Sequence, residues 1–432
     1  MTDDAAAVRA AIADAHRRSW GRVLATTVRV TRDLDLAEEA VQEAYVSAVA
    51  AWQRDGIPEN PEGWLTTAAR RRAVDAIRRE SALRAKLPLL LEPEATDGAD
   101  AFVAELAPVA DDRTADIPDE RLRLIFLCCH PALAQDAQLA LTLRLVCGVP
   151  TADIARLFLV PEPTMAARMT RAKKKIVTAR IPYRVPAAAE LPDRLRAVLG
   201  VIHLLFTTGH TSPSGASLMR TELADQALAL ARMLSELMPD EPEVRGLLAL
   251  ILVTDARRST RVDPDGRLVR LEHQDRSQWD RSALAEAHDL IVDGLRVGGA
   301  GRYALQAAIA SLYAEAPTYE RTDWPQLVEL YDALLVTWPS PVVAVNRTVP
   351  LSMVRGPEQA LAELEELQQD ARLAGYPYLP AIVAELLLRL GRDDEAVVAL
   401  ERARELTANE TERTFLSERI AQVRNTARES SR

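Results

Sequence analysis

A short run of this sequence, Cys128-Cys129-His130, contains residue types that bind zinc or act as nucleophiles. Adjacent residues of a helix point in different directions, and the chain has no second group of ligands at zinc-binding spacing. The run lies inside the apolar segment LIFLCCHPAL, and a free cysteine packs like a small apolar side chain. We therefore expect these residues to belong to a hydrophobic core, with no metal and no cofactor.

A second cluster has the residue types of acid–base catalysis: Glu272, His273, Asp275 and Asp280. Ordinary hydrogen bonding in a polar loop explains these residue types more simply. His203 and His210 lie beside apolar or turn residues and are expected to be structural. The sequence also has no glycine-rich phosphate loop and no nucleophile motif, so it predicts a protein that is not an enzyme.

Basic side chains gather in two short segments, where they could neutralise the phosphates of a nucleic acid. They are Arg70, Arg71, Arg72, Arg78 and Arg79 in the first segment, and Arg168, Arg171, Lys173, Lys174 and Lys175 in the second. In isolation, such runs are usually solvated helix faces. The choice between the two interpretations depends on the elements that carry the runs.

Charge is unevenly distributed along the 432 residues, whose net charge is −10. Residues 1–180 contain 25 Lys and Arg against 26 Asp and Glu, so the remaining residues carry a net charge of −9. Residues 87–120 contain ten acidic residues and one basic residue, which predicts an acidic linker. Local basic clusters decide contact with DNA, and the front of the chain contains them.

The first basic segment belongs to a predicted pair of helices. In residues 37–52, apolar side chains recur at helical spacing and carboxylates occupy the opposite face. Asn60 followed by Pro61 predicts the start of the second helix, because Asn caps a helix and Pro is tolerated at its first position. That helix extends to about residue 80, and its apolar stripe leaves the arginines to project elsewhere.

The second basic segment belongs to a predicted helix-turn-helix. A helix over about residues 135–147 ends at Gly148, and a short helix begins near Thr151. A tight turn at residues 159–161 leads into a helix that begins near Pro163 and bears the basic residues. In DNA-binding proteins the second helix of this motif enters the major groove.

Composition favours an all-α protein, because Ala, Leu, Arg and Glu dominate and are strong helix formers. The three cysteines form no disulfide framework, and the N-terminal sequence is not a signal peptide. Apolar runs such as residues 247–253 are far shorter than the ~20 residues of a membrane helix. We therefore expect a cytoplasmic protein that does not contact a membrane.

The C-terminal part contains predicted helix pairs. Residues 376–410 fit a tetratricopeptide repeat, whose packing positions match Ala384, Gly391, Ala396, Leu400 and Ala403. A weaker copy precedes it by 36 positions. A repeat needs stacked neighbours to bury its apolar face, so we expect one helical superstructure.

The segments that carry these patterns resemble those of a known family. DLDLAEEAVQEAYVSAVAAW and NPEGWLTTAARRRAVDAIRR resemble region 2 of the bacterial extracytoplasmic-function (ECF) RNA polymerase sigma factors. DERLRLIFLCCHPAL and LALTLRLVCGVPTADIARLFLVPEPTMAARMTRAKKKI resemble region 4. LLFTTGH, LVRLEHQDRSQWDR, LQAAIASLYAEA, PSPVVAVNR and LLLRLGRDDEA resemble the long tetratricopeptide-like extension of one ECF subgroup.

The resemblance covers nearly the whole chain and implies five parts. They are region 2 (1–86), an acidic linker (87–118), region 4 as a helix-turn-helix (119–180), a helical extension (181–300) and tetratricopeptide-like repeats (301–432). It implies contact with core polymerase, at the β′ clamp helices and the β flap, and with promoter DNA. It also implies that the protein directs polymerase to specific promoters and helps to melt the −10 element.

The resemblance also implies roles for individual residues. The positions that match the polymerase-docking face are Asp35, Glu38, Glu39, Gln42 and Glu43. Those that match the −10 surface are Asn60, Pro61, Trp64, Arg70, Arg71, Arg72, Arg78 and Arg79. Those that match the −35 surface are Thr164, Ala166, Ala167, Arg168, Thr170, Arg171, Lys173 and Lys174.

Two features of the predicted helix-turn-helix depart from the family pattern. Pro161 and Pro163 flank Glu162, where one proline is expected, and Pro163 restricts the conformation of Glu162. Ala166 and Ala167 are small, so base recognition there must be apolar or indirect.

The long extension is expected to regulate activity by binding a regulatory protein or a ligand, because solenoids present concave surfaces. Whether it activates or inhibits stays open. The alternative function is a stand-alone helix-turn-helix regulator with a helical sensor domain, which would bind its operator without polymerase.

Overall fold

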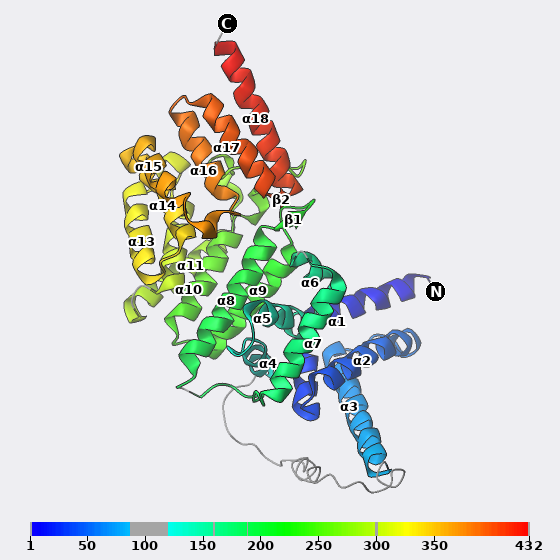
Figure 1. The fold of residues 1–432 in the computed structure, drawn as a ribbon. Coiled ribbons are helices and arrows are strands. Elements are labelled where there is room, and N and C mark those ends of the chain that lie inside the picture. Colours follow the sequence, from blue (N-terminus) through cyan, green and yellow to red (C-terminus); the bar gives the residue numbers. More distant parts are fainter. Residues whose placement is uncertain (1, 87–119, 159, 188, 299–300, 431–432) are drawn as a thin grey trace. The chain divides into compact units, whose positions relative to one another are not determined.

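The computed structural model describes residues 2–86, 120–158, 160–187, 189–298 and 301–430, and these form two compact units. The first unit ends at Val201 and the second begins at Ile202, within one helix (Figure 1). The all-α prediction is confirmed, since the described residues include only two strands of two residues each. The predicted acidic linker (87–118) lies outside the described residues.

Before the helix that crosses the boundary, the described residues of the first unit form seven α-helices and a π-helical turn. They are α1 (Thr2–Thr31), α2 (Leu34–Asp55), α3 (Pro61–Lys86), α4 (Glu120–Cys128), α5 (Gln135–Leu141), η3 (Thr142–Val146), α6 (Thr151–Leu157) and α7 (Glu162–Thr178). α1, α2 and α3 pack against one another, and α6 and α7 form the helix-turn-helix.

Side-chain caps explain where the second and third helices begin. The Asp33 carboxylate accepts hydrogen bonds from the backbone N–H groups of Asp35 and Leu36 at the start of α2. The Asn60 side chain accepts one from the Gly63 N–H at 2.9 Å, and Pro61 is the first residue of α3. The predicted Asn-Pro helix start is therefore confirmed.

The predicted helix over residues 135–147 is not a single α-helix. It changes after Leu141 into a π-helical turn, in which the Cys147 N–H donates to the Thr142 carbonyl five residues earlier. The wider turn ends before Gly148, whose φ is +68°. A Cβ atom on Gly148 would lie 2.8 Å from the Trp20 ring, so this position needs glycine for its conformation and for its contact with α1.

α1 is the element that joins the two halves of the first unit. It packs against α2 and α3 on one side and against α4 and η3 on the other. The backbone approach is close at Gly21, where a Cβ atom would collide with the Val146 carbonyl. The Tyr183 hydroxyl adds a hydrogen bond of 2.9 Å to the Ala25 carbonyl of α1.

The second unit is built from successive helices that pack mainly on their chain neighbours. They are the C-terminal part of α8 (Leu191–His210), α9 (Thr221–Leu237), α10 (Pro242–Asp255), α11 (Arg281–Gly298), α12 (Arg302–Glu315), α13 (Trp324–Thr337), α14 (Pro341–Arg355), α15 (Pro357–Leu367), α16 (Tyr378–Arg389), α17 (Asp393–Leu406) and α18 (Glu410–Ser430). Short 3-10 turns occur at Arg258–Thr260, Leu271–His273, Arg276–Gln278, Tyr319–Arg321 and Ala371–Leu373.

The predicted helix pair at residues 376–410 is present as α16 and α17. Ala384, Ala396 and Ala403 are completely buried, and Leu400 is 2% exposed in the same core. Gly391 has a φ of +70° in the turn between the helices, a conformation that glycine adopts without strain. The small residues therefore lie where the two helices of a repeat approach each other.

A short parallel pairing connects distant parts of the second unit. β1 (Ser214–Gly215) pairs with β2 (Ala408–Asn409). The fully buried Asn409 side chain donates hydrogen bonds of 3.0 Å to the carbonyls of Ser212 and Ser217. The start of the extension and its last repeat therefore belong to one body.

Two buried histidines make the stability of the second unit depend on pH. Burial lowers the pKa of His203 from 6.5 to about 4 and that of His210 to about 2. Between these values and 6.5 the unfolded chain binds more protons than the folded one, so stability falls as pH drops through this window. For His203 alone we expect a loss of up to about 3 kcal/mol.

Thermal unfolding at about pH 7 and about pH 4.5 would measure this loss. His203→Gln should flatten the dependence, whereas His273→Gln is the matched control because its side chain is 70% exposed. If stability depended equally on pH in the two variants, the assignment of this pH dependence to His203 would be contradicted.

Candidate nucleic-acid and protein interfaces

One face of α2 is acidic and exposed. Asp35, Glu39 and Gln42 are exposed, and Glu43 is partly exposed on the same face. Along this face the helix continues with Val46 and Val49, whose residues are 71% and 40% exposed. Exposed apolar side chains bordered by charges are typical of a protein-binding surface. We call Asp35, Glu39, Gln42, Glu43, Val46 and Val49 the α2 face.

Glu38 differs from the other predicted docking residues because it is buried, with 8% exposure. Arg144 of η3 donates to its carboxylate at 2.6 Å, and Lys173 of α7 donates to it at 2.8 Å. Lys173 also donates to Asp35 at 2.7 Å. The structure therefore joins the predicted polymerase-docking helix to the predicted DNA-reading helix through these ion pairs.

The environment of Lys173 favours its charged form. Burial by itself would lower the pKa of Lys173, but the hydrogen bonds to Asp35 and Glu38 outweigh burial and raise it. The Lys173 side chain is only 14% exposed and that of Glu38 11% exposed, so solvent screens this pair weakly. Asp35, with a 74% exposed side chain, adds little to its strength.

The loop before α3 and the first turns of that helix place the predicted −10 residues together. Asn60 is exposed, and Trp64 is partly exposed with its ring 5.8 Å from that of Trp52. Ile57, in the preceding loop, is 44% exposed. This group offers apolar and aromatic surface on which an unstacked base could lie.

The arginines of α3 divide into two groups. Arg70, Arg71, Arg78 and Arg79 are exposed, as phosphate contacts require. Arg72 instead donates to Glu43 at 2.5 Å and to the Ser47 hydroxyl at 2.6 Å. One predicted −10 residue is therefore paired with one predicted docking residue.

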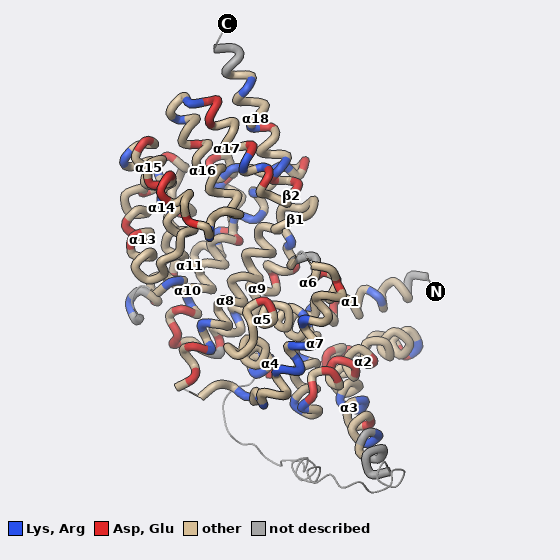
Figure 2. Tube along the Cα trace, in the orientation of Figure 1, with Lys and Arg blue, Asp and Glu red and all other residues tan. Residues whose placement is uncertain are grey.

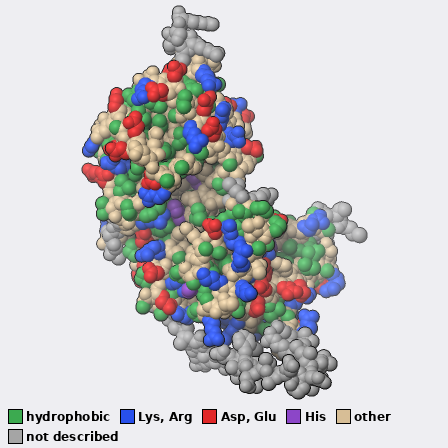
Figure 3. Space-filling view, in the orientation of Figure 1, with side chains coloured by type: hydrophobic (Ala, Val, Ile, Leu, Met, Phe, Trp, Pro, Cys, Tyr) green, Lys and Arg blue, Asp and Glu red, His purple; other side chains and the backbone are tan. Residues whose placement is uncertain are grey.

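α7 has the amphipathic character of a recognition helix. Met165, Met169, Ala172 and Ile176 bury its inner face. The outer face exposes most of the predicted −35 residues, namely Thr164, Ala166, Ala167, Thr170, Arg171 and Lys174. Figure 2 shows basic residues along α7 and acidic residues on the nearby part of α2, and Figure 3 shows basic and acidic side chains exposed on this face of the molecule.

Two predicted −35 residues are engaged within the protein. Lys173 binds α2, and Arg168 donates to Asp136 at 3.1 Å while lying over the Phe158 ring at 5.6 Å. The helix begins at Glu162, one residue before the predicted Pro163, and the Pro161 carbonyl accepts from the N–H groups of Thr164 and Met165. The two prolines are thus accommodated in the first turn of α7.

Sequence reasoning missed Val46, Val49, Ile57 and Arg144. Val46 and Val49 could have been found, because each is an apolar residue at a position that the helical pattern leaves exposed. Ile57 lies in the loop before α3, where helical periodicity gives no signal. Arg144 could not have been found, because its partner Glu38 is 106 residues away along the chain.

The residues with catalytic or metal-binding side chains lie in ordinary structural settings. Cys128, Cys129 and Cys147 are buried and form no disulfide, and burial raises the pKa of Cys129 and Cys147 to about 12. Such thiols are not nucleophilic. Within the described residues no group of three His, Cys, Asp or Glu side chains could hold a metal ion.

The loop over residues 272–280 consists of short 3-10 turns. Asp275 caps one of them by accepting from the Ser277 N–H at 2.9 Å. Asp280 accepts from the Ala283 N–H at 3.0 Å at the start of α11. These carboxylates therefore have structural partners.

None of the described helices combines the length and apolar content that a bilayer crossing requires.

Three family models match successive parts of the chain. "Sigma-70 region 2" matches residues 9–82, and "Sigma-70, region 4" matches residues 123–176. A family of unknown function, DUF6596, matches residues 194–294. The first two matches cover α1–α3 and α4–α7, the helices that carry the interfaces described above.

Similar proteins agree with this division. "Uncharacterized protein R00370" of Rhizobium meliloti (strain 1021) is 41% identical over 406 residues, which cover 94% of this chain and 93% of that protein. "ECF RNA polymerase sigma factor SigK" of Mycobacterium tuberculosis (strain ATCC 25618 / H37Rv) is 29% identical over 175 residues, which cover 39% of this chain and 84% of SigK.

Solved structures show only a weak likeness to the chain. Yeast Tom70 aligns with a TM-score of 0.38 at 12% identity and covers 93% of this chain and 82% of that one. The TPR domain of P58(IPK) aligns with a TM-score of 0.24 at 13% identity and covers 92% and 99%. The tetratricopeptide-like character of the extension therefore rests on its own helix pairs.

Proposed function

Because the chain belongs to the ECF family of RNA polymerase sigma factors, with a long tetratricopeptide-like extension, we propose that it directs core polymerase to specific promoters and helps to melt the −10 element. One observation carries the proposal: the two modules of the first unit, α1–α3 and α4–α7, expose complementary sets of side chains. The α2 face is acidic and apolar, whereas α3 and α7 expose arginine, lysine and small polar residues.

We propose that the α2 face binds the β′ clamp helices of polymerase. The exposed Val46 and Val49 supply apolar area at the centre, and Glu39, Gln42 and Asp35 supply polar contacts beside them. Glu38 becomes available only after Arg144 and Lys173 release it.

We propose that the loop before α3 holds the −10 element. Asn60, Ile57 and Trp64 surround the start of the helix, where a base flipped out of the duplex could stack. The exposed arginines of α3 neutralise the phosphates of the opened strand. Melting then follows from stronger binding of the opened strand than of the duplex.

We propose that α7 reads the −35 element in the major groove while region 4 also contacts the β flap. Arg171 and Lys174 bind phosphates, and Thr164, Ala166, Ala167 and Thr170 face the base edges. Because Lys173 forms ion pairs with Asp35 and Glu38 of α2, it can contact a phosphate only after α7 separates from α2. We therefore propose that this arrangement is a closed state, which polymerase opens on binding.

We further propose that the extension regulates the first unit and that the chain performs no covalent chemistry. The second unit contains 231 residues, from Ile202 to Arg432, and none of the interface residues lies in it. Deleting it should change promoter selectivity or the response to a signal. Unchanged activity and regulation after its removal would contradict this proposal.

Co-elution tests the proposed function. The full chain should co-elute with bacterial core RNA polymerase in size-exclusion chromatography, and the complex should start transcription from a promoter that core polymerase alone ignores. If the chain failed to co-elute and bound duplex DNA tightly by itself, it would be a stand-alone regulator.

Arg171 and Lys174 provide a test of the DNA-reading helix. Replacing either residue with Gln should weaken binding of the polymerase complex to promoter DNA and reduce the slope of log affinity against log salt by about 1. Arg196→Gln is the matched control, because its side chain is 79% exposed and lies on another helix. An unchanged salt slope in both test variants would contradict the assignment of α7.

A further inference from the structure

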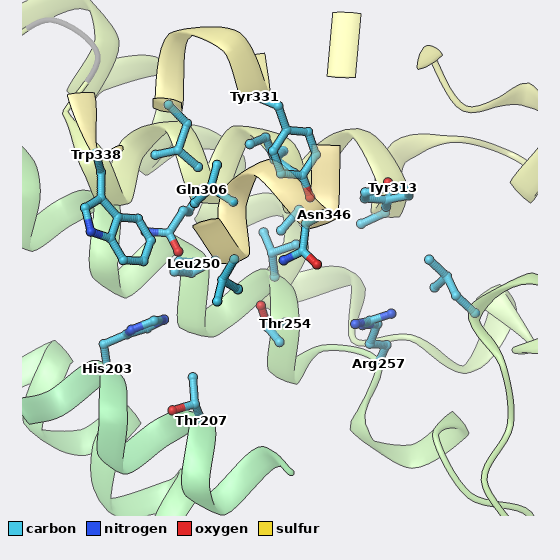
Figure 4. A pocket seen from close by; sticks show the side chains of 18 of the residues that line it. His203, Thr207, Leu250, Thr254, Arg257, Gln306, Tyr313, Tyr331, Trp338 and Asn346 are labelled. Atoms are coloured by element: carbon cyan, nitrogen blue, oxygen red, sulfur yellow. The ribbon is translucent and has the colours of Figure 1, made fainter. Parts of the chain in front are cut away.

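The second unit contains a cavity that the proposed promoter function does not use. Its volume is about 470 Å³, which is within the usual range for small-molecule sites. Side chains from α8, α10, α12, α13 and α14 surround it (Figure 4). All of its lining residues belong to the second unit, between His203 and Asn346.

An unpaired arginine lies at one end of the cavity. The Arg257 side chain points into it beside Thr254 and Tyr313 (Figure 4), and part of the side chain stays accessible. Within the described residues, the groups that act on its guanidinium are Arg276 and Tyr313, and neither is a carboxylate. A half-buried charge has lost part of its hydration, so this group is one that a bound anion would stabilise.

Neighbouring cations strengthen the attraction for an anion. Burial lowers the pKa of Arg257, and the charge of Arg276 lowers it further. Arg276 donates to the carbonyls of Tyr313 and Ala316, which carry no full negative charge, and its Nη2 atom is buried without a partner. Arg261 adds another cation that Arg257 repels. Arg257 therefore lies near a second guanidinium group, that of Arg276, which also interacts with the carboxylate of Glu320.

The remaining walls suit an apolar or aromatic body. Leu250, Ile309, Leu334, Val343, Tyr331 and Trp338 line the cavity. Figure 4 shows His203 and Trp338 at the end opposite Arg257. Burial lowers the pKa of His203 to about 4, so its imidazole is neutral at neutral pH. The Arg302 guanidinium lies over the Trp338 ring at 3.5 Å at this end, but Arg302 is not among the residues that line the cavity. The lining is thus mainly apolar and aromatic, with Arg257 as its charged side chain.

We propose that this cavity is a binding site for a small molecule with an anionic group, a carboxylate or a phosphate, on an aromatic or aliphatic body. The anion forms a charge-assisted pair with Arg257, and the body packs against Trp338 and the aliphatic walls. The site is built from the second unit alone. Binding can be measured without polymerase, so its failure would leave the proposed sigma function unaffected.

Three matched probes test the proposal by isothermal titration calorimetry with the full chain. They are naphthalene-2-carboxylate, 2-naphthyl phosphate and the neutral 2-naphthamide. We expect at least one anion to bind at least tenfold more tightly than the amide, and the stronger of the two identifies the anionic group. Equal binding of all three probes, or no binding at about 1 mM, would overturn the proposal.

Two variants locate the site. Arg257→Met should abolish the preference for the anion while leaving amide binding nearly unchanged. Ala310→Phe should weaken all three probes, because Ala310 lines the cavity and a phenyl ring would occupy it. Arg267→Met is the control, since its side chain is 61% exposed outside the cavity. The proposed location would be contradicted if Arg257→Met still bound the anions more tightly than the amide. It would also be contradicted if Ala310→Phe bound the three probes as well as the unmodified chain does.

The stability of Arg257→Met separates a binding role from a structural one. If Arg257 stabilised the fold through a structural partner, its replacement would lower Tm. An unpaired buried charge should do the opposite, so we expect Tm of the ligand-free variant to rise by about 2–4 °C. A fall in Tm would show that Arg257 has a structural partner and would overturn its assignment as the anion-binding group.

Discussion

Val46→Asp and Glu39→Lys are each expected to weaken binding to core RNA polymerase at least tenfold, a loss of about 1.4 kcal/mol or more. Val46 is 71% exposed, so a carboxylate there stays hydrated in the free protein and is desolvated only in the complex. Glu39→Lys reverses a charge on the same face without touching the buried Glu38 pair. Fluorescence anisotropy of the labelled chain titrated with core polymerase would measure both affinities.

The controls are surface changes of the same kind elsewhere in the chain. Val398→Asp is matched to Val46→Asp because Val398 is 66% exposed on α17. Asp193→Lys is matched to Glu39→Lys because the Asp193 side chain is 81% exposed on α8. Both controls should bind polymerase like the unmodified chain. If all four variants bound equally well, the α2 face would not be the docking surface.

Lys173→Glu is expected to have two opposite effects. It places a third carboxylate beside Asp35 and Glu38, which should lower the free energy of unfolding of the first unit by about 3 kcal/mol. It also frees the docking helix from α7, so polymerase no longer has to break this contact before binding. We expect the affinity for core polymerase, measured without DNA, to rise about tenfold.

Lys174→Glu is the matched control, because it makes the same charge change at an exposed neighbour. Gly21→Leu is expected to separate α1 from η3 without changing a charge, since a side chain there would collide with the Val146 carbonyl. Gly200→Leu is its control, because a Cβ atom at Gly200 meets nothing within 4 Å. The closed-state interpretation would fail if Lys173→Glu and Gly21→Leu left polymerase affinity unchanged while urea denaturation showed the expected destabilisation.

Local signals in the sequence predicted the helices and most of their exposed faces. Asn60 and Pro61 start a helix through caps that involve only near neighbours, and the spacing of Ala384, Ala396 and Ala403 predicts a helix pair for the same reason. Exposure of the α7 outer face likewise follows from helical periodicity, because its apolar residues repeat at 3.6-residue spacing and bury the opposite side.

Sequence reasoning could not show the interactions that depend on a partner far along the chain. The helix predicted over about residues 135–147 is present as α5 and η3, but helical periodicity does not distinguish an α-helix from one that ends in a π-helical turn. That turn contains Arg144, whose guanidinium binds Glu38. Glu38, Lys173 and Arg168 were predicted as contact residues, yet each is paired within the protein.

Residue types and their spacing were enough to predict that this chain is helical, that residues 1–180 resemble regions 2 and 4 of sigma factors, and which residues lie on each helix face. These properties depend on residue types within a few positions of one another. Only the tertiary structure decided that Lys173 lies against Asp35 and Glu38, and that Arg257 faces a cavity without a counter-ion. Ion pairs and cavities form between segments that folding brings together, so residue spacing along the chain does not encode them.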